Sequence, residues 1–172
     1  MLNTINRSSL ALLNILNDIL DITKIEADQL KVEFIPTHLR DVVESTVLLM
    51  RSTPQNKEAQ VCLFIDPTIP DWILSDPTRL RQILFNLVGN AFKFTDKQKS
   101  RIKIEITPLL KPDGVTQLEI RIADNGIGMD SELISKLFKP FTQGDVSTAR
   151  KFGGTGLGLS ITRHLVHLLN GD

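Results

Sequence analysis

Residues 117–129 read Gln-Leu-Glu-Ile-Arg-Ile-Ala-Asp-Asn-Gly-Ile-Gly-Met and join an expected strand to a glycine-rich turn. Apolar and polar side chains alternate over residues 118–123, which is the period of a strand with one buried face. The alternation stops at Asp124, and Gly126 and Gly128 follow closely. Because glycine has no Cβ atom, the backbone there can approach a flat ligand. The segment therefore predicts a carboxylate at a strand end beside an open turn.

An ionised aspartate only accepts hydrogen bonds, so Asp124 would select a ligand that donates one. The exocyclic amine of adenine is such a donor, whereas guanine offers a carbonyl oxygen. The alternative is an ordinary hairpin turn, because Asn125 followed by Gly126 is also a common turn signal. This segment alone leaves both interpretations open.

The composition is that of a globular chain without a strong bulk charge. The 172 residues are 41% apolar and 23% charged, and twenty basic side chains balance twenty acidic ones. This length suits one domain with an appended element, and the charge balance gives no reason to expect nucleic acid or an anionic membrane as a partner. We expect a cytoplasmic fragment with no membrane contact of its own, although its parent protein could be anchored elsewhere. We expect the single cysteine, Cys62, to occupy a core position.

Residues 2–29 contain no proline or glycine and carry apolar side chains at heptad spacing, which predicts one long helix. A second apolar stripe of Leu13, Leu16 and Leu20 widens its apolar face beyond what one docking surface needs. The helix lies either on its own domain or in a multi-helix bundle. We favour the bundle, because little of this sequence precedes the helix to pack on it.

The rest of the chain alternates strand and helix signals. The pattern predicts strands at 32–35, 60–66, 72–74, 101–109 and 117–124, and helices at 38–52 (capped by Thr37), 78–94 (capped by Asp76), 131–138 (capped by Asp130 or Ser131) and after 158. The two strands before Asp124 form a hairpin. Residues 139–153 read as a long loop of the kind that often covers a ligand, anchored in the core by Phe138 and Phe141.

The helix at 78–94 carries a polar line beside its core face. Asn86, Asn90 and Lys93 are spaced by four and three residues, so their side chains share one side of the helix. An amide oxygen suits Mg²⁺, and the lysine would balance phosphate charge. The alternative is a solvated polar face without a ligand. The expected core face consists of Leu80, Ile83, Leu84, Leu87 and Ala91.

Residues 153–159, Gly-Gly-Thr-Gly-Leu-Gly-Leu, lead into the last apolar helix. Glycines at a helix N-terminus expose unpaired N–H groups at the positive end of the helix dipole, which favours phosphate. The segment is not a P-loop, and no strand precedes it directly as in a dinucleotide fingerprint. Three weak signals in this order predict an adenine acceptor, a metal and charge face, and a phosphate cradle.

Together these segments resemble the ATP-binding catalytic domain of sensor histidine kinases, in the superfamily of gyrase, the heat-shock chaperone ATPases and the mismatch-repair ATPases. Residues 86–95 look like its N box, 124–129 its G1 box, 138–141 its F box and 154–159 its G2 box. The first helix, through residues 18–27, resembles the second helix of the family's dimerisation and phosphotransfer bundle.

This resemblance implies an α+β fold, a two-layer α/β sandwich of Bergerat type with a long N-terminal helix. The partial bundle helix would occupy residues 1–30 and the ATP-binding domain residues 31–172. The family normally adds another strand hairpin after these residues, so we expect an exposed sheet edge.

The resemblance also assigns roles. Asn90 would ligate Mg²⁺ with Asn86 beside it, and these two with Lys93 would form the catalytic set. Asp124 would accept from the adenine amine. The other implied contacts to ATP are Phe94, Gly126, Gly128, Met129, Phe138 and Arg150, with Gly154, Thr155, Gly156, Leu157 and Gly158 around the triphosphate.

Asn86 bears on the reaction type. Hydrolytic relatives carry at the matching site a glutamate that activates water, and an amide cannot take that proton. Transfer of the γ-phosphoryl group to a histidine is therefore favoured, with onward signalling to the receiver domain of a response regulator. His38, His164 and His167 lack the phosphoacceptor context, so the acceptor helix is expected outside this chain, in a homodimer formed through the first helix. The alternatives are a catalytically silent nucleotide-binding or dimerisation module and a hydrolytic ATPase.

Overall fold

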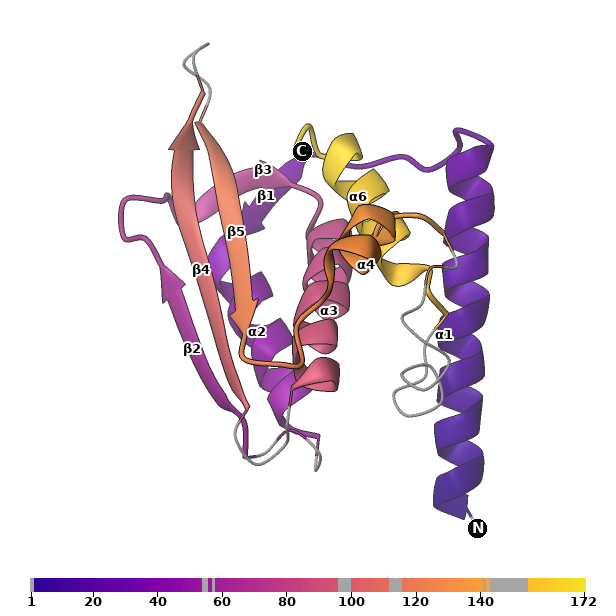
Figure 1. Ribbon diagram of the computed structural model, residues 1–172. Helices are drawn as coiled ribbons and strands as arrows, with labels where there is room; N and C mark the ends of the chain where they lie inside the picture. The colour runs from indigo at the N-terminus through magenta and orange to yellow at the C-terminus, as the bar shows by residue number, and fades with distance from the viewer. Residues whose placement is uncertain are drawn as a thin grey trace.

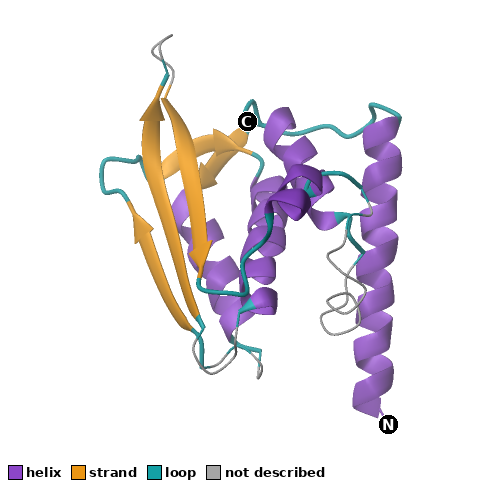
Figure 2. Ribbon diagram, in the orientation of Figure 1, coloured by secondary structure: helices purple, strands orange, loops and turns teal. Residues whose placement is uncertain are grey.

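The computed structural model describes residues 2–53, 56, 58–95, 100–111, 116–140, 142 and 155–172. Figures 1 and 2 show strands on one side, helices α2, α3 and α6 on the other, and α1 running alongside α6. In chain order the elements are α1 (Leu2–Glu26), β1 (Ile35–His38), α2 (Leu39–Arg51), β2 (Gln60–Ile65), β3 (Trp72–Ser75), α3 (Pro77–Phe94), β4 (Arg101–Leu110), β5 (Thr116–Asp124), α4 (Ser131–Lys136) and α6 (Gly158–Leu168).

The main sheet of the described residues has the order β2-β4-β5 and mixes two pairing directions. Strands β2 and β4 are parallel, and β4 and β5 form the predicted antiparallel hairpin. The register sets Asp124 opposite Ile102, near the start of β4. Strands β1 and β3 form a separate antiparallel ribbon. The predicted α+β sandwich, with helices against one face of a mixed sheet, is confirmed.

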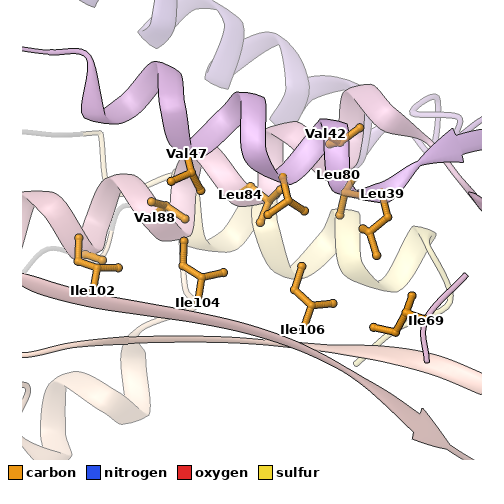
Figure 3. Packing of buried hydrophobic residues seen from close by; sticks show 12 residues of the cluster. Leu39, Val42, Val47, Ile69, Leu80, Leu84, Val88, Ile102, Ile104 and Ile106 are labelled. Atoms are coloured by element: carbon orange, nitrogen blue, oxygen red, sulfur yellow. The ribbon is translucent and has the colours of Figure 1, made fainter. Parts of the chain in front are cut away.

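The first apolar cluster fills the space between the sheet and α2 and α3. Ile102, Ile104 and Ile106 alternate along β4 and are at most 1% exposed, and Figure 3 shows them facing the helix side chains. Each such side chain contributes about 1.5–3 kcal/mol through burial. The helix partners in this cluster are Leu39, Val42, Val43 and Val47 of α2 and Leu80, Leu84, Val88 and Ala91 of α3.

A second apolar cluster lies on the opposite side of α3, against α6. Its buried members are Leu30, Ile83, Leu157, Ile161 and Leu165. Ile22 and Ile25 of α1 and Leu87 of α3 pack against it. The single core face predicted for α3 is therefore two faces, because this helix lies between the sheet and α6.

Among the described side chains, helix α1 contacts this second cluster through its C-terminal turns, and it ends at Glu26, before Asp28 with its positive φ of 54°. Towards its N-terminus, large apolar side chains from Leu12 to Leu20 are between 40% and 58% exposed. The helix thus lies on its own domain through its C-terminal turns and keeps an uncovered apolar face between Leu12 and Leu20. Its membership of a multi-helix bundle stays a prediction.

The predicted strand at 32–35 is wrong, because β1 begins at Ile35 and continues through Pro36 to His38. Proline fits there since β1 is an edge strand of its two-stranded ribbon. His38 also replaces Thr37 as the cap of α2, with its Nδ1 accepting from the Asp41 N–H at 3.3 Å. The Thr37 hydroxyl is buried instead within 3.0 Å of the Ser75 carbonyl oxygen.

The core position predicted for Cys62 is also wrong, because this side chain is exposed. Val61, Leu63 and Ile65 of β2 pack on the first cluster, and the period of two sends Cys62 to the other face. The predicted caps at the other helices are confirmed. Asp76 accepts from the N–H groups of Thr78 and Arg79, and Asp130 accepts from that of Leu133.

Candidate functional site

The turn after β5 is pinned to two neighbouring elements. The Asp124 Oδ1 atom accepts from the Gly126 N–H at 2.8 Å, and the Ile127 N–H donates to the Phe94 carbonyl oxygen at 3.2 Å. The Arg101 N–H donates to Asn125 Oδ1 at 2.7 Å, at the start of β4. These contacts hold the exposed Asp124 carboxylate at the strand end, beside the last turn of α3.

The two glycines of this turn serve different purposes. A Cβ atom on Gly126 would lie 2.5 Å from the Phe94 carbonyl oxygen and 2.6 Å from Asp124 Oδ1, so this glycine permits the turn to approach α3. A Cβ atom on Gly128 would meet nothing within 4 Å, but its φ of +71° disfavours other residues. The open approach predicted for a ligand therefore exists at Gly128, whereas Gly126 is needed for internal packing.

The polar line on α3 is half-buried and reaches α6. The Asn86 amide donates to the Gly158 carbonyl oxygen at 3.1 Å and lies 3.3 Å from Thr162 Oγ1. Asn90, one turn further along, makes no side-chain hydrogen bond within the described residues. Asn86 thus ties α3 to the first residue of α6, and the Asn90 amide is left available to a ligand.

Lys93 completes this line near the glycine turn. Its ammonium lies 4.7 Å from the centre of the Phe94 ring, and partial burial lowers the pKa of Lys93 from its ordinary value. A bound anion would reverse this shift, because an opposite charge favours the protonated amine. The Lys93 ammonium is therefore a partly desolvated cation, and a bound phosphate would compensate for its lost hydration.

The described part of the predicted phosphate cradle is residues 155–158, at the entrance to α6. Gly156 has a positive φ of 72°, and the N-cap residue Leu157 provides no side-chain cap. The Leu157 N–H donates to Thr155 Oγ1 at 3.2 Å. With no cap on the first turn, N–H groups at the positive end of the helix remain for an anion. The predicted contacts Arg150 and Gly154, like Phe141, lie outside the described residues.

Phe138 lies on the surface rather than in the core. Its side chain is 44% exposed, and the Arg163 guanidinium of α6 lies 5.9 Å from its ring centre. The predicted core anchor is therefore wrong for Phe138, because its described contact is a cation over the ring. Met129 is also exposed, at 54%.

All three predicted segments border α3. The glycine turn contacts α3 through Phe94, the polar line is part of it, and α6 contacts it through Asn86. In the described residues no group of three or more His, Cys, Asp or Glu side chains could hold a metal. The amide oxygen of Asn90 nevertheless suits Mg²⁺, which keeps most of its waters and takes phosphate oxygens as ligands.

Sequence reasoning missed one polar residue at this site, Asp18 of α1. Its Oδ2 accepts from the Thr155 hydroxyl at 3.0 Å across 137 residues of sequence. Burial raises the pKa of the Asp18 carboxyl, the charge of Asp21 raises it further, and the Thr155 hydrogen bond opposes both. No local pattern identifies this contact, because it arises only where α1 docks beside α6.

Residues 75–172 match a family model described as histidine kinase-, DNA gyrase B-, and HSP90-like ATPase. This match covers more than half of the chain. The chain belongs to this family. The signal transduction histidine-protein kinase BarA of Escherichia coli (strain K12) is 44% identical over 171 residues, which are 99% of this chain and 18% of BarA. The chain therefore spans less than a fifth of that relative.

Two solved structures share the fold. Full-length ShkA in complex with AMPPNP aligns over 96% of this chain and 33% of its own, with a TM-score of 0.79 and 27% identity. The histidine kinase ThkA in complex with response regulator protein TrrA aligns over 97% of this chain and 43% of its own, with a TM-score of 0.67 and 23% identity.

These similarities confirm the predicted family, the ATP-binding catalytic domain of sensor histidine kinases in two-component signal transduction. Among the described residues, no helix is both long enough and apolar enough to cross a bilayer.

Proposed function

We propose that this chain binds Mg·ATP and transfers the γ-phosphoryl group to a histidine on a helix outside it. The observation that carries the proposal is the meeting of the three nucleotide motifs around α3, through the Ile127 to Phe94 and Asn86 to Gly158 hydrogen bonds. Residues 31–172 would form the catalytic domain and residues 1–30 the second helix of the dimerisation bundle.

At the adenine end, Asp124 would accept a hydrogen bond from the exocyclic amine. Its Oδ1 already accepts from Gly126, which orients the carboxylate before any ligand arrives. Gly128 and Met129 would lie against the base, where the turn is open and exposed. Preorientation of this kind lowers the entropy lost on binding.

At the phosphate end, Asn90 would hold Mg²⁺ and Lys93 would face the phosphates. The ion would supply charge neutralisation of the transferring phosphoryl group. Gly156 and Gly158 would offer N–H groups at the start of α6, on either side of the Leu157 N–H that donates to Thr155. The chain's own residues thus bind, orient and neutralise, which is most of what phosphoryl transfer requires of a protein.

Asn86 supports transfer over hydrolysis. Its amide is engaged with the Gly158 carbonyl and Thr162, and an amide has no basic site with which to activate water. The phosphoryl acceptor would therefore be a protein nucleophile. ATP use implies that the chain acts in the cytoplasm, whether or not its parent protein is membrane-anchored.

The partners follow from the same proposal. The exposed apolar stretch of α1 between Leu12 and Leu20 would join a homodimeric bundle that contains the acceptor histidine. ThkA was crystallised with a response regulator, which supports a receiver domain as the next acceptor here.

The first test is calorimetric titration of ATP, with and without Mg²⁺, into the chain and into Asp124→Asn. The variant should bind ATP about tenfold or more weakly, because one acceptor for the adenine amine becomes a possible donor. Asp130→Asn is the matched control, since it removes a nearby charge and keeps a good N-cap for α4. Equal affinities of wild type and Asp124→Asn would refute the adenine assignment.

The second test supplies a separate phosphoacceptor helix and follows labelled phosphate. Transfer from ATP to the acceptor histidine is expected, with little phosphate release in its absence. ATP binding without any transfer to an intact acceptor would instead favour a silent regulatory module, which the absence of the acceptor motif from this chain motivates. Rapid phosphate release without acceptor would favour hydrolysis and contradict the role given to Asn86.

A further inference from the structure

Helix α1 places a carboxylate against the entrance to α6. Asp18 Oδ2 accepts from the Thr155 hydroxyl at 3.0 Å, and the same hydroxyl oxygen accepts from the Leu157 N–H at 3.2 Å. A hydrogen-bonded chain therefore runs from α1 through Thr155 to the first turn of α6. In Figure 1 the described residues immediately before α6 lie beside α1, in agreement with the Thr155 to Asp18 hydrogen bond.

Neighbouring contacts hold Asp18 in this position. One turn further along α1, Asp21 accepts from the Gln82 amide at 2.6 Å and lies 3.8 Å from the Arg79 guanidinium. Ile22 and Ile25 pack against the second apolar cluster. Asp18 is thus a docked residue whose side chain is part-buried in an ordered interface.

This arrangement places the negative charge of Asp18 close to the positive end of the α6 helix dipole. The start of α6 favours an anion, because its N–H groups and the helix dipole present positive charge. The Asp18 carboxylate is itself an anion, and it reaches that end through Thr155. A triphosphate bound there would be repelled at short range by the negative charge of Asp18. The repulsion is strong because the setting is partly desolvated.

We propose that Asp18 is a positioning residue that holds Thr155 and opposes the triphosphate, so that docking of α1 and binding of ATP disfavour each other. The inference rests on the proposed function, since it concerns the phosphate end of the same site. Because coupling between two binding events is reciprocal, ATP loosens α1 by the same factor by which docked α1 weakens ATP. The ATP-loaded catalytic domain is then the form that leaves α1 most readily.

The test compares wild type with Asp18→Asn in calorimetric titrations of adenosine, ADP and ATP in Mg²⁺. Asparagine keeps an acceptor for the Thr155 hydroxyl and removes only the charge. ATP should bind about three- to tenfold more tightly to the variant, ADP less so, and adenosine within about twofold of wild type. The gain should shrink at high salt, because added ions screen part-exposed charges.

Asp21→Asn is the matched control. It removes the same charge one helical turn away and keeps an acceptor for Gln82, but it does not contact Thr155. Its ATP affinity should stay within about twofold of wild type, because the described contacts of Asp21 are with Gln82 and Arg79 of α3 and not with the segment that enters α6. A gain in ATP affinity caused by loosened α1 alone would appear in both variants, so a gain confined to Asp18→Asn isolates the charge of Asp18.

A second readout is hydrogen exchange of the backbone amides between Ile15 and Glu26. ATP should accelerate this exchange in wild type, and adenosine should not. If Asp18→Asn leaves ATP affinity within twofold or weakens it, while Asp124→Asn abolishes tight binding, only the present inference is overturned. If wild type binds no ATP at all, both the proposed function and this inference are refuted.

Discussion

The two apolar clusters on either side of α3 are built differently. The cluster facing the sheet has twelve buried members drawn from α2, α3, β4 and one loop position. The cluster facing α6 and α1 has five among the described residues, and beside it the carboxylates of Asp18 and Asp21 accept hydrogen bonds from Thr155 and Gln82. Only the first is dominated by fully buried aliphatic side chains on a central strand.

This difference teaches that the chain contains a firmly packed body and a more weakly attached helix. Apolar packing is lost only by unfolding the sheet, whereas a small mixed interface can open by itself. The candidate nucleotide site lies where the two meet. We therefore expect nucleotide binding to affect the attachment of α1 while the sheet stays folded.

The largest effect should come from the centre of the body. Ile104→Ala should lower the free energy of unfolding by about 3–4 kcal/mol, because it opens a cavity at a fully buried position on β4. Chemical denaturation monitored by circular dichroism would measure this. Leu110→Ala, at a 72% exposed position on the same strand, should change it by less than about 0.5 kcal/mol. Similar losses of unfolding free energy in both variants would refute the difference between the buried and exposed positions of β4.

The next effect tests whether the candidate adenine turn belongs to the body. Gly126→Ala should lower stability by about 2–3 kcal/mol and weaken ATP binding, because its methyl group would overlap the Phe94 carbonyl oxygen. Gly128→Ala meets no neighbour and should lose only about 1 kcal/mol, from its positive φ. Thermal unfolding and ATP titration of both variants would check this order, and the reverse order would contradict the packing role of Gly126.

A smaller effect should appear at the attached helix. Ile25→Ala removes a contact with the second cluster while improving helix propensity, so any loss reports docking. Hydrogen exchange of α1 should accelerate about five- to tenfold, with β4 amides unchanged, which corresponds to about 1 kcal/mol. Leu16→Ala, 48% exposed, is the control and should change little. Equal acceleration in β4 would mean that α1 and the sheet open together.

The smallest effect is a pH dependence of α1 docking. Burial raises the pKa of the Asp18 carboxyl above its ordinary value of 3.8. The docked state then binds the proton more tightly than the undocked state, so docking strengthens as the pH falls through the docked-state pKa towards 3.8. Exchange protection of α1 relative to Asp18→Asn should therefore rise as the pH falls from neutral towards 3.8. A difference that is flat or falls over this range would contradict the shift.

Local signals predicted much of the fold and the motif positions. The alternation of Ile102, Ile104 and Ile106 indicated a strand with one buried face, and Asp76 before Pro77 indicated a helix start. These features depend on neighbours in sequence, so the periodicity of apolar residues and the capping residues predict them. The polar line of α3 was visible for the same reason, because helical spacing puts Asn86 and Asn90 on one side.

Features that depend on distant neighbours were missed or misplaced. Cys62 lies in an apolar run, but only the sheet's contact with the helices decides which side of β2 is buried. Thr37 suits a helix cap as well as His38 does, and pairing of β1 with β3 buried its hydroxyl against Ser75 instead. Phe138 is apolar, yet it meets Arg163 near the surface.

The sequence by itself determined most of the strands and helices, the order of the nucleotide motifs and the family to which the chain belongs. Periodicity, capping and glycine placement are local properties, because each depends only on residues that are close together in the sequence. Only the tertiary structure decided that α3 divides two cores and that Asn86 joins α6. It alone brought Asp18 to Thr155, because that contact requires the first helix to dock against a segment from the other end of the chain.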